Sequence, residues 1–373
     1  MPTKAELIKT LCQTRLGCFA RVAFGWAHPE RKYKHHWPMD VLGDALERCS
    51  TGETKRLIIN MPPRSLKSFK ASVAFPAWVL ARKPETKIMC IAGSRGLADD
   101  LHTLTLKLMK HPGYRALFPH IKLTESGSTI RLAHGGSRGA YVASPGGGIT
   151  GRGADIVVVD DPLGASHADD DQRREAINLW YDQNVYQRLD DKHKGVVVVV
   201  MQRLHVDDLT GHLLNRDGWE VLNLPAIAIE DELFTLSDGR LVGRSKGEAL
   251  HPGLEDHAQV RQLMLDAGAK IFMAQYQQEP YAPGQGNGYH GAATFLSHPD
   301  EVPRPGWSPW GFTHIEEERL VLDKVFGERM CVMPGFVPFQ TVEDWLEWAQ
   351  EYTDQLRANG HFDDWPHMKN KRA

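Results

Sequence analysis

The segment LIINMPPRSLKSF at residues 57–69 carries the residue types best suited to chemistry. A strand that enters a tight loop, followed by Lys-Ser at the start of a helix, is typical of a phosphate-binding loop. There, main-chain N–H groups and the Lys ammonium surround phosphates, and the Ser hydroxyl binds Mg²⁺. Lys67 and Ser68 fit these two roles. Arg64 adds a second cation that could hold phosphate through two parallel hydrogen bonds.

This loop departs from the usual GxxxxGK[ST] pattern, which has glycine at the positions of Met61 and Leu66. A polar helix start after a Pro-Pro turn is the alternative interpretation. We retain phosphate groups with Mg²⁺ as the expected ligand of the loop. The candidate binding residues are Pro63, Arg64, Ser65, Leu66, Lys67 and Ser68.

A second candidate segment, ADIVVVDDP at Ala154–Pro162, follows about ninety residues later. A buried strand that ends in two acids supplies one carboxylate for a magnesium ion and one for the attacking water, as phosphoryl transfer requires. Asp160 is the candidate metal ligand and Asp161 the candidate catalytic acid. An ordinary Asp-Asp-Pro turn is the alternative, but the order of the two segments favours the catalytic interpretation.

Two further segments surround this strand in the sequence. The loop SPGGGITGRG at Ser144–Gly153 carries Arg152, which could stabilise charge on a transferring phosphoryl group; an incidental Arg in a flexible loop is the alternative. After the valine run, Gln202 is a candidate sensor of the γ-phosphate. His205 and the acids beside it look like a metal cluster only superficially, and we expect those acids to cap a helix.

Short apolar runs alternate with longer mixed segments through the first two thirds of the chain. Such runs predict a parallel sheet covered on both faces, and therefore an α/β fold. The predicted strands are Arg56–Asn60, Lys87–Ala92, Ser128–Ala133, Arg138–Ser144, Ile156–Val159 and Gly195–Met201. The predicted helices are Lys67–Arg82, a helix capped by Ser94 that reaches Lys110, and Asp169–Leu189.

Composition narrows the class of protein. The chain has 373 residues, 42% hydrophobic residues and a net charge of −3, which excludes disorder over its whole length. Its five cysteines never form a CxxC pair, so we expect neither a disulfide framework nor a structural zinc site, and a reducing compartment is favoured. We expect no membrane span, since no apolar run reaches roughly 18 residues. The first 120 residues are rich in Lys and Arg, and the last ninety are acidic. A polyanionic partner is one interpretation, and solvated surface is the other.

Taken in order, these segments resemble the ATPase region of the large terminase subunit of tailed bacteriophages. The resemblance covers residues 30–282 and rests on IINMPPRSLKS, IAGSRGLADDL, TGRGADIVVVDDP, VVVVVMQRLHVDDLTGHLL and FMAQYQQEP. It implies an additional-strand P-loop NTPase that assembles as a homo-oligomeric ring at the capsid portal. The implied activity is pumping of double-stranded DNA with ATP and Mg²⁺, and the implied partners are the portal protein and the small terminase subunit. The implied location is the cytoplasm of an infected or prophage-carrying bacterium.

The same resemblance implies a role for each candidate residue. Arg64, Lys67 and Ser68 would bind the nucleotide phosphates and magnesium. Asp160 would be the acid on the magnesium side. Asp161 stands where many relatives have a catalytic Glu. Arg152 takes the place of the arginine finger, and Gln202 lies in the segment that couples hydrolysis to DNA movement.

We expect an ATPase domain over residues 1–282, with a helical lead-in at 1–50, and a small C-terminal appendage over 283–373. The appendage begins with a Gly-rich linker and continues as Trp- and Glu-rich sequence with one amphipathic helix at Thr341–Leu356. Large terminases usually continue into a nuclease domain with strand-end acids. The tail acids here do not follow apolar strands, so nuclease activity is not expected. The alternatives are a helicase-like translocase and a non-hydrolysing interaction protein with a decayed ATPase fold.

Overall fold

The structure is a computed structural model that describes residues 3–143, 149 and 151–280. These residues belong to two compact units. One comprises the chain up to Asp256 together with Ala274–Pro280, and the other includes His257–Met273. The predicted helix at Thr341–Leu356 lies outside the described residues, as does the whole predicted appendage. The predicted domain boundary near residue 282 therefore stays a prediction.

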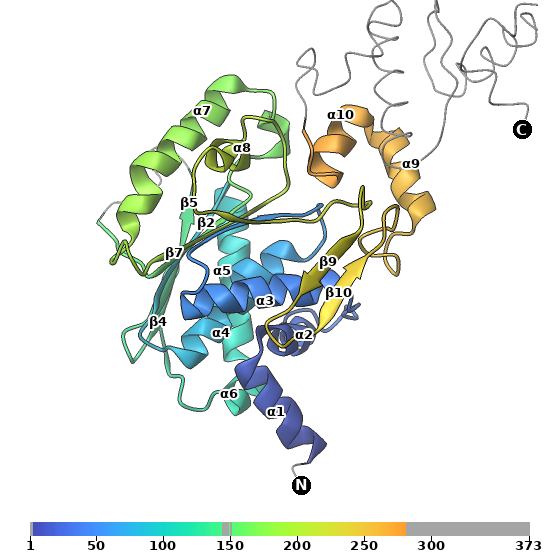
Figure 1. The fold of residues 1–373 in the computed structure, drawn as a ribbon. Coiled ribbons are helices and arrows are strands. Elements are labelled where there is room, and N and C mark those ends of the chain that lie inside the picture. Colours follow the sequence, from blue (N-terminus) through green and yellow to red (C-terminus); the bar gives the residue numbers. More distant parts are fainter. Residues whose placement is uncertain (1–2, 144–148, 150, 281–373) are drawn as a thin grey trace, which may run out of the picture. The chain divides into compact units, whose positions relative to one another are not determined.

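An eight-stranded sheet forms the centre of the larger unit (Figure 1). Its order is β3-β4-β5-β2-β6-β7-β1-β8; β3, β4 and β5 pair antiparallel, and every other neighbouring pair is parallel. The strands are β1 (Arg56–Asn60), β2 (Lys87–Ala92), β3 (Leu123–Ser126), β4 (Thr129–Leu132), β5 (Ser137–Val142), β6 (Ile156–Asp160), β7 (Val196–Met201) and β8 (Glu220–Asn223). A separate antiparallel hairpin consists of β9 (Glu232–Thr235) and β10 (Leu241–Arg244). The predicted α/β class with a mainly parallel sheet is confirmed.

Strand β7 lies between β1 and β6, the two strands that precede the candidate phosphate loop and the candidate acids. Its register pairs Val199 with Ile58 on one side and Val198 with Val158 on the other. β7 is thus inserted between the strand of the lysine-serine loop and the strand of the two acids. Since neighbouring strands are about 4.8 Å apart, it separates β1 from β6 by roughly 10 Å.

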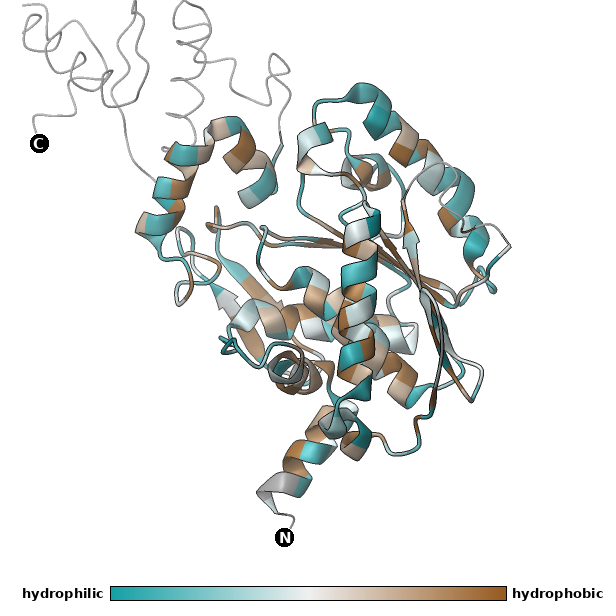
Figure 2. Cartoon of the chain, turned by 180° about the vertical axis from the view of Figure 1, so that it is seen from behind, coloured by the Kyte–Doolittle hydropathy of each residue, from teal (hydrophilic) through white to brown (hydrophobic). Residues whose placement is uncertain are grey.

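Alternate residues of the central strands pack into cores on opposite faces of the sheet. On β1, Leu57 and Ile59 belong to one core and Ile58 to the other. The first core receives side chains from helices α1 (Lys4–Thr14), α2 (Leu16–Ala27), α3 (Trp37–Thr51), α4 (Phe75–Arg82), α5 (Arg95–Lys110) and α6 (Pro112–Leu117). The second receives them from α7 (Asp171–Trp180) and α8 (Leu209–Leu214). Figure 2 shows mainly hydrophobic residues along the central strands and mixed colours on α5. Burial on both faces explains why β7 begins with five consecutive valines.

The helix predicted over Asp169–Leu189 is wrong as one continuous element. The α-helix ends at Trp180 and is followed by a π-helical turn, η3 (Tyr181–Val185), and a 3₁₀ turn, η4 (Tyr186–Arg188). Trp180, Tyr181 and Val185 are all buried in the second core. The Asn184 amide donates to the Trp180 carbonyl at 2.9 Å, so packing and a side-chain hydrogen bond reshape the end of this helix.

Other predicted bounds also differ from those observed, and some elements, β3 among them, were not predicted. The helix predicted from Lys67 begins with a π-helical segment, η1 (Phe69–Ala74), before α4. The edge strand β8 and the hairpin were not predicted. The remaining elements are η2 (Ala165–His167), α9 (His257–Ala267), α10 (Ala269–Ile271) and η5 (Phe272–Tyr276). Within the described part of the chain, none of the helices has the length and apolar character needed to cross a bilayer.

Candidate active site

The carboxyl ends of three neighbouring parallel strands bring the candidate residues to one edge of the sheet. Asn60 at the end of β1 is in register with Met201 on β7, and Val200 on β7 is in register with Asp160 at the end of β6. The loops that follow these strands therefore emerge side by side. In parallel α/β sheets this edge is where ligands bind.

The loop between β1 and η1 adopts left-handed backbone conformations without glycine. Arg64 has φ 61° and Leu66 has φ 63°. Leu66 stands where the usual pattern has glycine, so the conformation is kept although the residue type differs. A left-handed conformation costs a side-chain-bearing residue roughly 1–2 kcal/mol. Packing of the half-buried Leu66 side chain against the first core offsets part of that cost.

Lys67 and Asp161 form an ion pair across this edge. Lys67 Nζ lies 3.3 Å from Asp161 Oδ2; the lysine side chain is 6% exposed and the aspartate side chain 27%. The Asp161 backbone has φ 40°, and its N–H donates to the Val200 carbonyl at 2.8 Å. Asp161 Oδ1 accepts from the Gln202 N–H at 3.2 Å. The candidate catalytic acid thus contacts the lysine of the loop and the first residue after β7.

Asp160 is buried beneath this pair and receives two hydroxyl groups. Ser68 Oγ donates to its Oδ1 at 2.8 Å, and Ser72 Oγ donates to its Oδ2. Burial, and next the nearby charge of Asp161, raise the pKa of Asp160 to about 6, against the opposing effects of the serine hydroxyls and Lys67. The positive charge near this carboxylate is therefore too small to offset its burial.

These oxygens fit a magnesium ion that also binds phosphates. Mg²⁺ in nucleotide sites is commonly bound by one or two protein oxygens, with phosphates and water completing its shell. The Ser68 hydroxyl and the Asp160 carboxylate are such oxygens, and they are already adjacent. Ser65 Oγ in the same loop is buried without a hydrogen-bond partner in the described structure. A polar ligand would satisfy such an atom.

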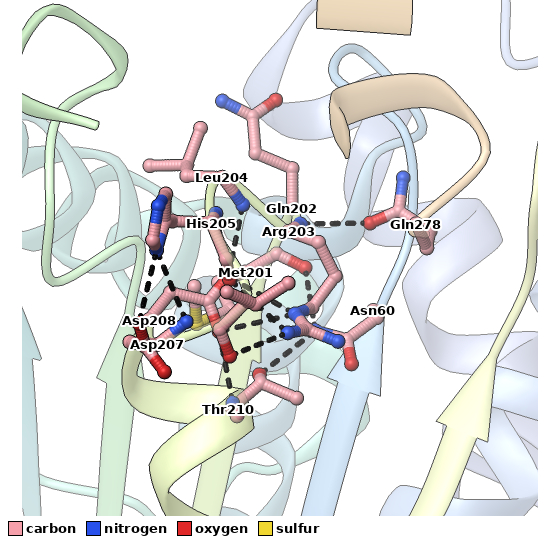
Figure 3. A network of polar contacts seen from close by, with 12 residues as sticks. Asn60, Met201, Gln202, Arg203, Leu204, His205, Asp207, Asp208, Thr210 and Gln278 are labelled. Atoms are coloured by element: carbon pink, nitrogen blue, oxygen red, sulfur yellow. Dashed lines mark hydrogen bonds and ion pairs between the residues drawn. The ribbon is translucent and has the colours of Figure 1, made fainter. Parts of the chain in front are cut away.

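Figure 3 shows the polar network that holds the segment after β7. Arg203 Nε lies 3.0 Å from both carboxylate oxygens of the fully buried Asp208. Asp208 caps α8 by accepting from the Gly211 N–H at 2.9 Å, as the sequence predicted. The Arg203 N–H donates to Gln278 Oε1 at 2.9 Å. Over the described residues, no group of three His, Cys, Asp or Glu side chains is arranged to hold a metal ion.

The Gln202 side chain points away from this network (Figure 3), and its oxygen Oε1 is buried without a partner in the described structure. Its main-chain N–H donates to Asp161, but its side-chain amide makes no contact among the described residues that indicates a role. The proposed role as a γ-phosphate sensor stays a prediction.

Arg152 is not brought together with the other candidates. Its guanidinium donates to the Tyr141 hydroxyl at 3.2 Å and lies 5.5 Å from the centre of that ring. Tyr141 belongs to β5, on the far side of β2 from β6. Arg152 is exposed, and its role as an arginine finger stays a prediction.

Sequence reasoning missed several residues that shape this edge. Ser72 lies one helical turn after Ser68, a spacing that could have pointed to it. At Gly93, after β2, an added Cβ would lie 2.3 Å from the Asp161 carbonyl oxygen, and no sequence signal marked this approach. Gln277 exchanges two hydrogen bonds with the Ile227 main chain, at 2.9 and 3.0 Å, in the manner of a strand residue. Its amide type gave no hint of that role.

Comparison with known proteins gives structural neighbours only. No family model matches the chain, and no curated protein matches it. Among solved structures, the large terminase of bacteriophage HK97 is similar at 16% identity with a TM-score of 0.39, over 57% of this chain and 44% of that one. The matched region thus spans less than half of that terminase.

Two further structures show similar values. An arginine-to-alanine mutant of the large terminase ATPase domain from Thermus phage P74-26 is 12% identical with a TM-score of 0.44, over 67% of this chain and 95% of that one. A large terminase from a thermophilic bacteriophage in complex with ADP is 10% identical with a TM-score of 0.31, over 48% of this chain and 44% of that one. These three solved structures are thus phage large terminases or an ATPase domain of one.

Proposed function

We propose that this chain is the ATP-hydrolysing subunit of a motor that packages double-stranded DNA, of the large terminase kind. The observation that carries the proposal is the meeting of the lysine-serine loop with two strand-end acids across an inserted strand. Lys67 contacts Asp161, and Ser68 contacts Asp160. This set of residues supplies a phosphate-binding cation, a magnesium site and a carboxylate for water, which are the parts that phosphoryl transfer requires.

The first step is binding of the triphosphate at the loop. The Lys67 ammonium exchanges Asp161 for phosphate oxygens, and main-chain N–H groups at the start of the helix bind the same phosphates. Arg64 adds charge at the rim of the loop. Once Lys67 faces phosphate, the Asp161 carboxylate is free to accept a hydrogen bond from the attacking water and then its proton.

The second step is stabilisation of the charge that develops on the transferring group. Mg²⁺ held by the Ser68 hydroxyl and the Asp160 carboxylate would neutralise charge on the phosphate oxygens. Arg152 acts as the arginine finger, in the same subunit or a neighbouring one. Through its N–H, Gln202 reports the state of Asp161 to the segment after β7.

The finer part of the proposal concerns the partners. The motor acts on double-stranded DNA in the cytoplasm of a bacterial host. It works as a ring of identical subunits with a portal protein and a small terminase subunit. The basic first third of the chain provides charge suited to the DNA backbone. A helicase-like translocase would use the same nucleotide chemistry but would separate strands.

The test is steady-state ATP hydrolysis with and without double-stranded DNA, comparing the unmodified chain with Asp161→Asn. We expect DNA-stimulated hydrolysis that falls by about 10²–10⁴-fold in the variant, because a positioned base contributes that much. Nucleotide binding should be retained. Asp155→Asn is the matched control, since its carboxylate lies at the opposite end of β6 and accepts from the Lys87 N–H.

Three other outcomes would redirect the proposal. Undiminished hydrolysis in Asp161→Asn would place the catalytic acid elsewhere. Strand separation without binding to a portal would favour a helicase-like translocase. Absence of hydrolysis by the unmodified chain with DNA, portal and small subunit present would favour an interaction protein with a decayed site.

A further inference from the structure

Ser72 contacts the acid of the candidate magnesium site, and its main chain is π-helical rather than α-helical. It belongs to the π-helical segment η1, in which the N–H of Phe75 reaches back five residues to the Lys70 carbonyl. In an α-helix the Ser72 carbonyl would accept from residue 76, but residue 76 is proline. Proline has no N–H, and its ring crowds the carbonyl four residues before it. The π-helical segment accommodates the missing N–H and the ring of Pro76. Such π-helical turns are frequent at functional sites.

A buried arginine supplies the donor that Pro76 lacks. Arg138 on β5 is 1% exposed, and its Nη2 donates to the Ser72 carbonyl at 3.1 Å. Its Nη1 lies 3.2 Å from His102 Nδ1. The pKa of His102 is lowered by burial and by Arg138, and its Nδ1 accepts because a guanidinium can only donate. The Ser72 main chain is therefore fixed by a cation from the sheet, itself oriented by α5.

The hydroxyl of the same residue faces the acid. Ser72 Oγ donates to Asp160 Oδ2, while Ser68 Oγ donates to Oδ1. Ser68 is a candidate magnesium ligand, so it must share its oxygen lone pairs with the ion. Ser72, one turn further along, can hold the carboxylate while the ion binds. Groups that orient a metal ligand in this way typically change metal affinity 10–100-fold when they are removed.

We propose that Ser72 is a positioning residue for the magnesium-side acid, and that Arg138 holds it in place because Pro76 cannot. The proposal deepens the ATPase assignment and rests on it. Ser72 fixes the rotamer of Asp160 so that one carboxylate oxygen is presented to the ion together with the Ser68 hydroxyl. Its loss should weaken the magnesium-dependent part of nucleotide binding and leave the magnesium-independent part unchanged.

The experiment measures binding of a fluorescent ATP analogue to the full chain, first in EDTA and then as Mg²⁺ is added. Ser72→Ala removes the hydroxyl, and Ser72→Cys keeps the side-chain volume with a weak donor. We expect both to bind the analogue in EDTA as the unmodified chain does. The Mg²⁺ concentration for half-maximal enhancement should rise at least tenfold in Ser72→Ala. Arg138→Met should shift it in the same direction.

Ser50→Ala is the matched control, because Ser50 Oγ donates only to a helix carbonyl, that of Glu47. An unchanged Mg²⁺ requirement in both Ser72 variants overturns the positioning role, and equal loss of binding in EDTA and in Mg²⁺ reduces Ser72 to a structural residue. Failure of the unmodified chain to bind the analogue at all overturns the proposed function, and this role with it.

Discussion

Lys67 is the residue on which the site depends most, because its ammonium is almost fully removed from water and has one carboxylate partner at 3.3 Å. A buried ammonium needs an anion to remain charged. In the nucleotide-free chain Asp161 is that anion, and in the proposed mechanism a phosphate replaces it. In that mechanism the same ion pair would keep Asp161 from acting as a base until nucleotide arrives.

Lys67→Ala should lower the affinity for ATP at least tenfold, since a hydrogen bond to a charged group is worth about 1.5–3 kcal/mol. Calorimetric titration with ATP measures this directly. Lys87→Ala is the control: its exposed ammonium pairs with Asp190 at the opposite end of the sheet, where an ion pair is worth little. Equal affinities of Lys67→Ala and the unmodified chain would remove Lys67 from the site.

Asp208 gives a second prediction at the scale of single residues. Its carboxylate is fully buried and holds Arg203, the Leu204 N–H and the α8 N-terminus. Asp208→Ala leaves the Arg203 cation without its partner, so we expect the free energy of unfolding to fall by about 3–5 kcal/mol. Urea denaturation measures the loss. Asp207→Ala, next to it with a 77% exposed side chain, should change stability by about 0.5 kcal/mol or less.

At the scale of elements, the turn after β2 must approach the turn after β6 closely. A Cβ at Gly93 would lie 2.3 Å from the Asp161 carbonyl oxygen and 2.9 Å from the Pro162 main chain. Both neighbours are backbone and cannot simply rotate away. The position of Asp161, the candidate catalytic acid, therefore depends on a residue without a side chain in the turn after a different strand.

Gly93→Ala should destabilise the fold by about 1–3 kcal/mol, as overpacking does. Because the clash displaces Asp161, turnover should fall more than nucleotide affinity. Gly96→Ala is the matched control, since a Cβ at Gly96 in the first turn of α5 meets nothing within 4 Å. That variant should be neutral, or more stable by up to about 1 kcal/mol. Thermal unfolding and steady-state kinetics of both proteins check the pair.

The elements that the sequence predicted best are those in which local propensity, apolar pattern and capping residues all favour the same structure. The bounds of β1 and β2 were predicted to the residue and those of α5 closely, because continuous apolar runs and the Ser94 cap define them locally. The inserted position of β7 was implied only by the resemblance, since strand order depends on contacts between distant segments. The short strand β8 lies at the edge of the sheet, where alternating burial leaves a weak signal.

Within the site, sequence predicted Lys67 and Ser68 at the helix start after β1, and the two acids at the end of β6, as the structure has them. It could not supply the left-handed backbone of Leu66, because leucine is among the residues that rarely adopt it. Arg138 was unpredictable for a similar reason. A lone arginine in a predicted strand reads as an exposed residue, whereas here it is enclosed between η1 and α5.

At the scale of the larger unit, two histidines join segments more than two hundred residues apart. The rings of His36 and His251 have centroids 3.5 Å apart, and the Nδ1 atom of each is buried without a partner in the described structure. Burial, His251, His35 and Lys70 together lower the pKa of His36 to about 3. His36 is also the N-cap of α3, where a positive charge is unfavourable.

This pair should make the fold sensitive to acid. The unfolded chain protonates His36 below about pH 6.5, whereas the folded chain resists protonation to about pH 3. Stability is therefore fully present above pH 6.5 and should decline at up to about 1.4 kcal/mol per pH unit below it. His36→Asn keeps a residue suited to capping and removes the titration, so its urea midpoint should change less between pH 7.5 and 5. An equal change in both proteins would contradict this.

Gln277 and Gln278 attach their segment to two other parts of the larger unit by hydrogen bonds. Gln277 is joined to Ile227 through both of its amide atoms, and Gln278 holds the Arg203 N–H next to the residue that contacts Asp161. A segment held by such hydrogen bonds passes a pulling force to the residues that it contacts. We expect a pull on the chain at Pro280 to load the bond between Gln278 and Arg203 first and then to draw Gln202 away from Asp161. In the proposed motor, mechanical load on this segment would then change the surroundings of Asp161 without touching the nucleotide.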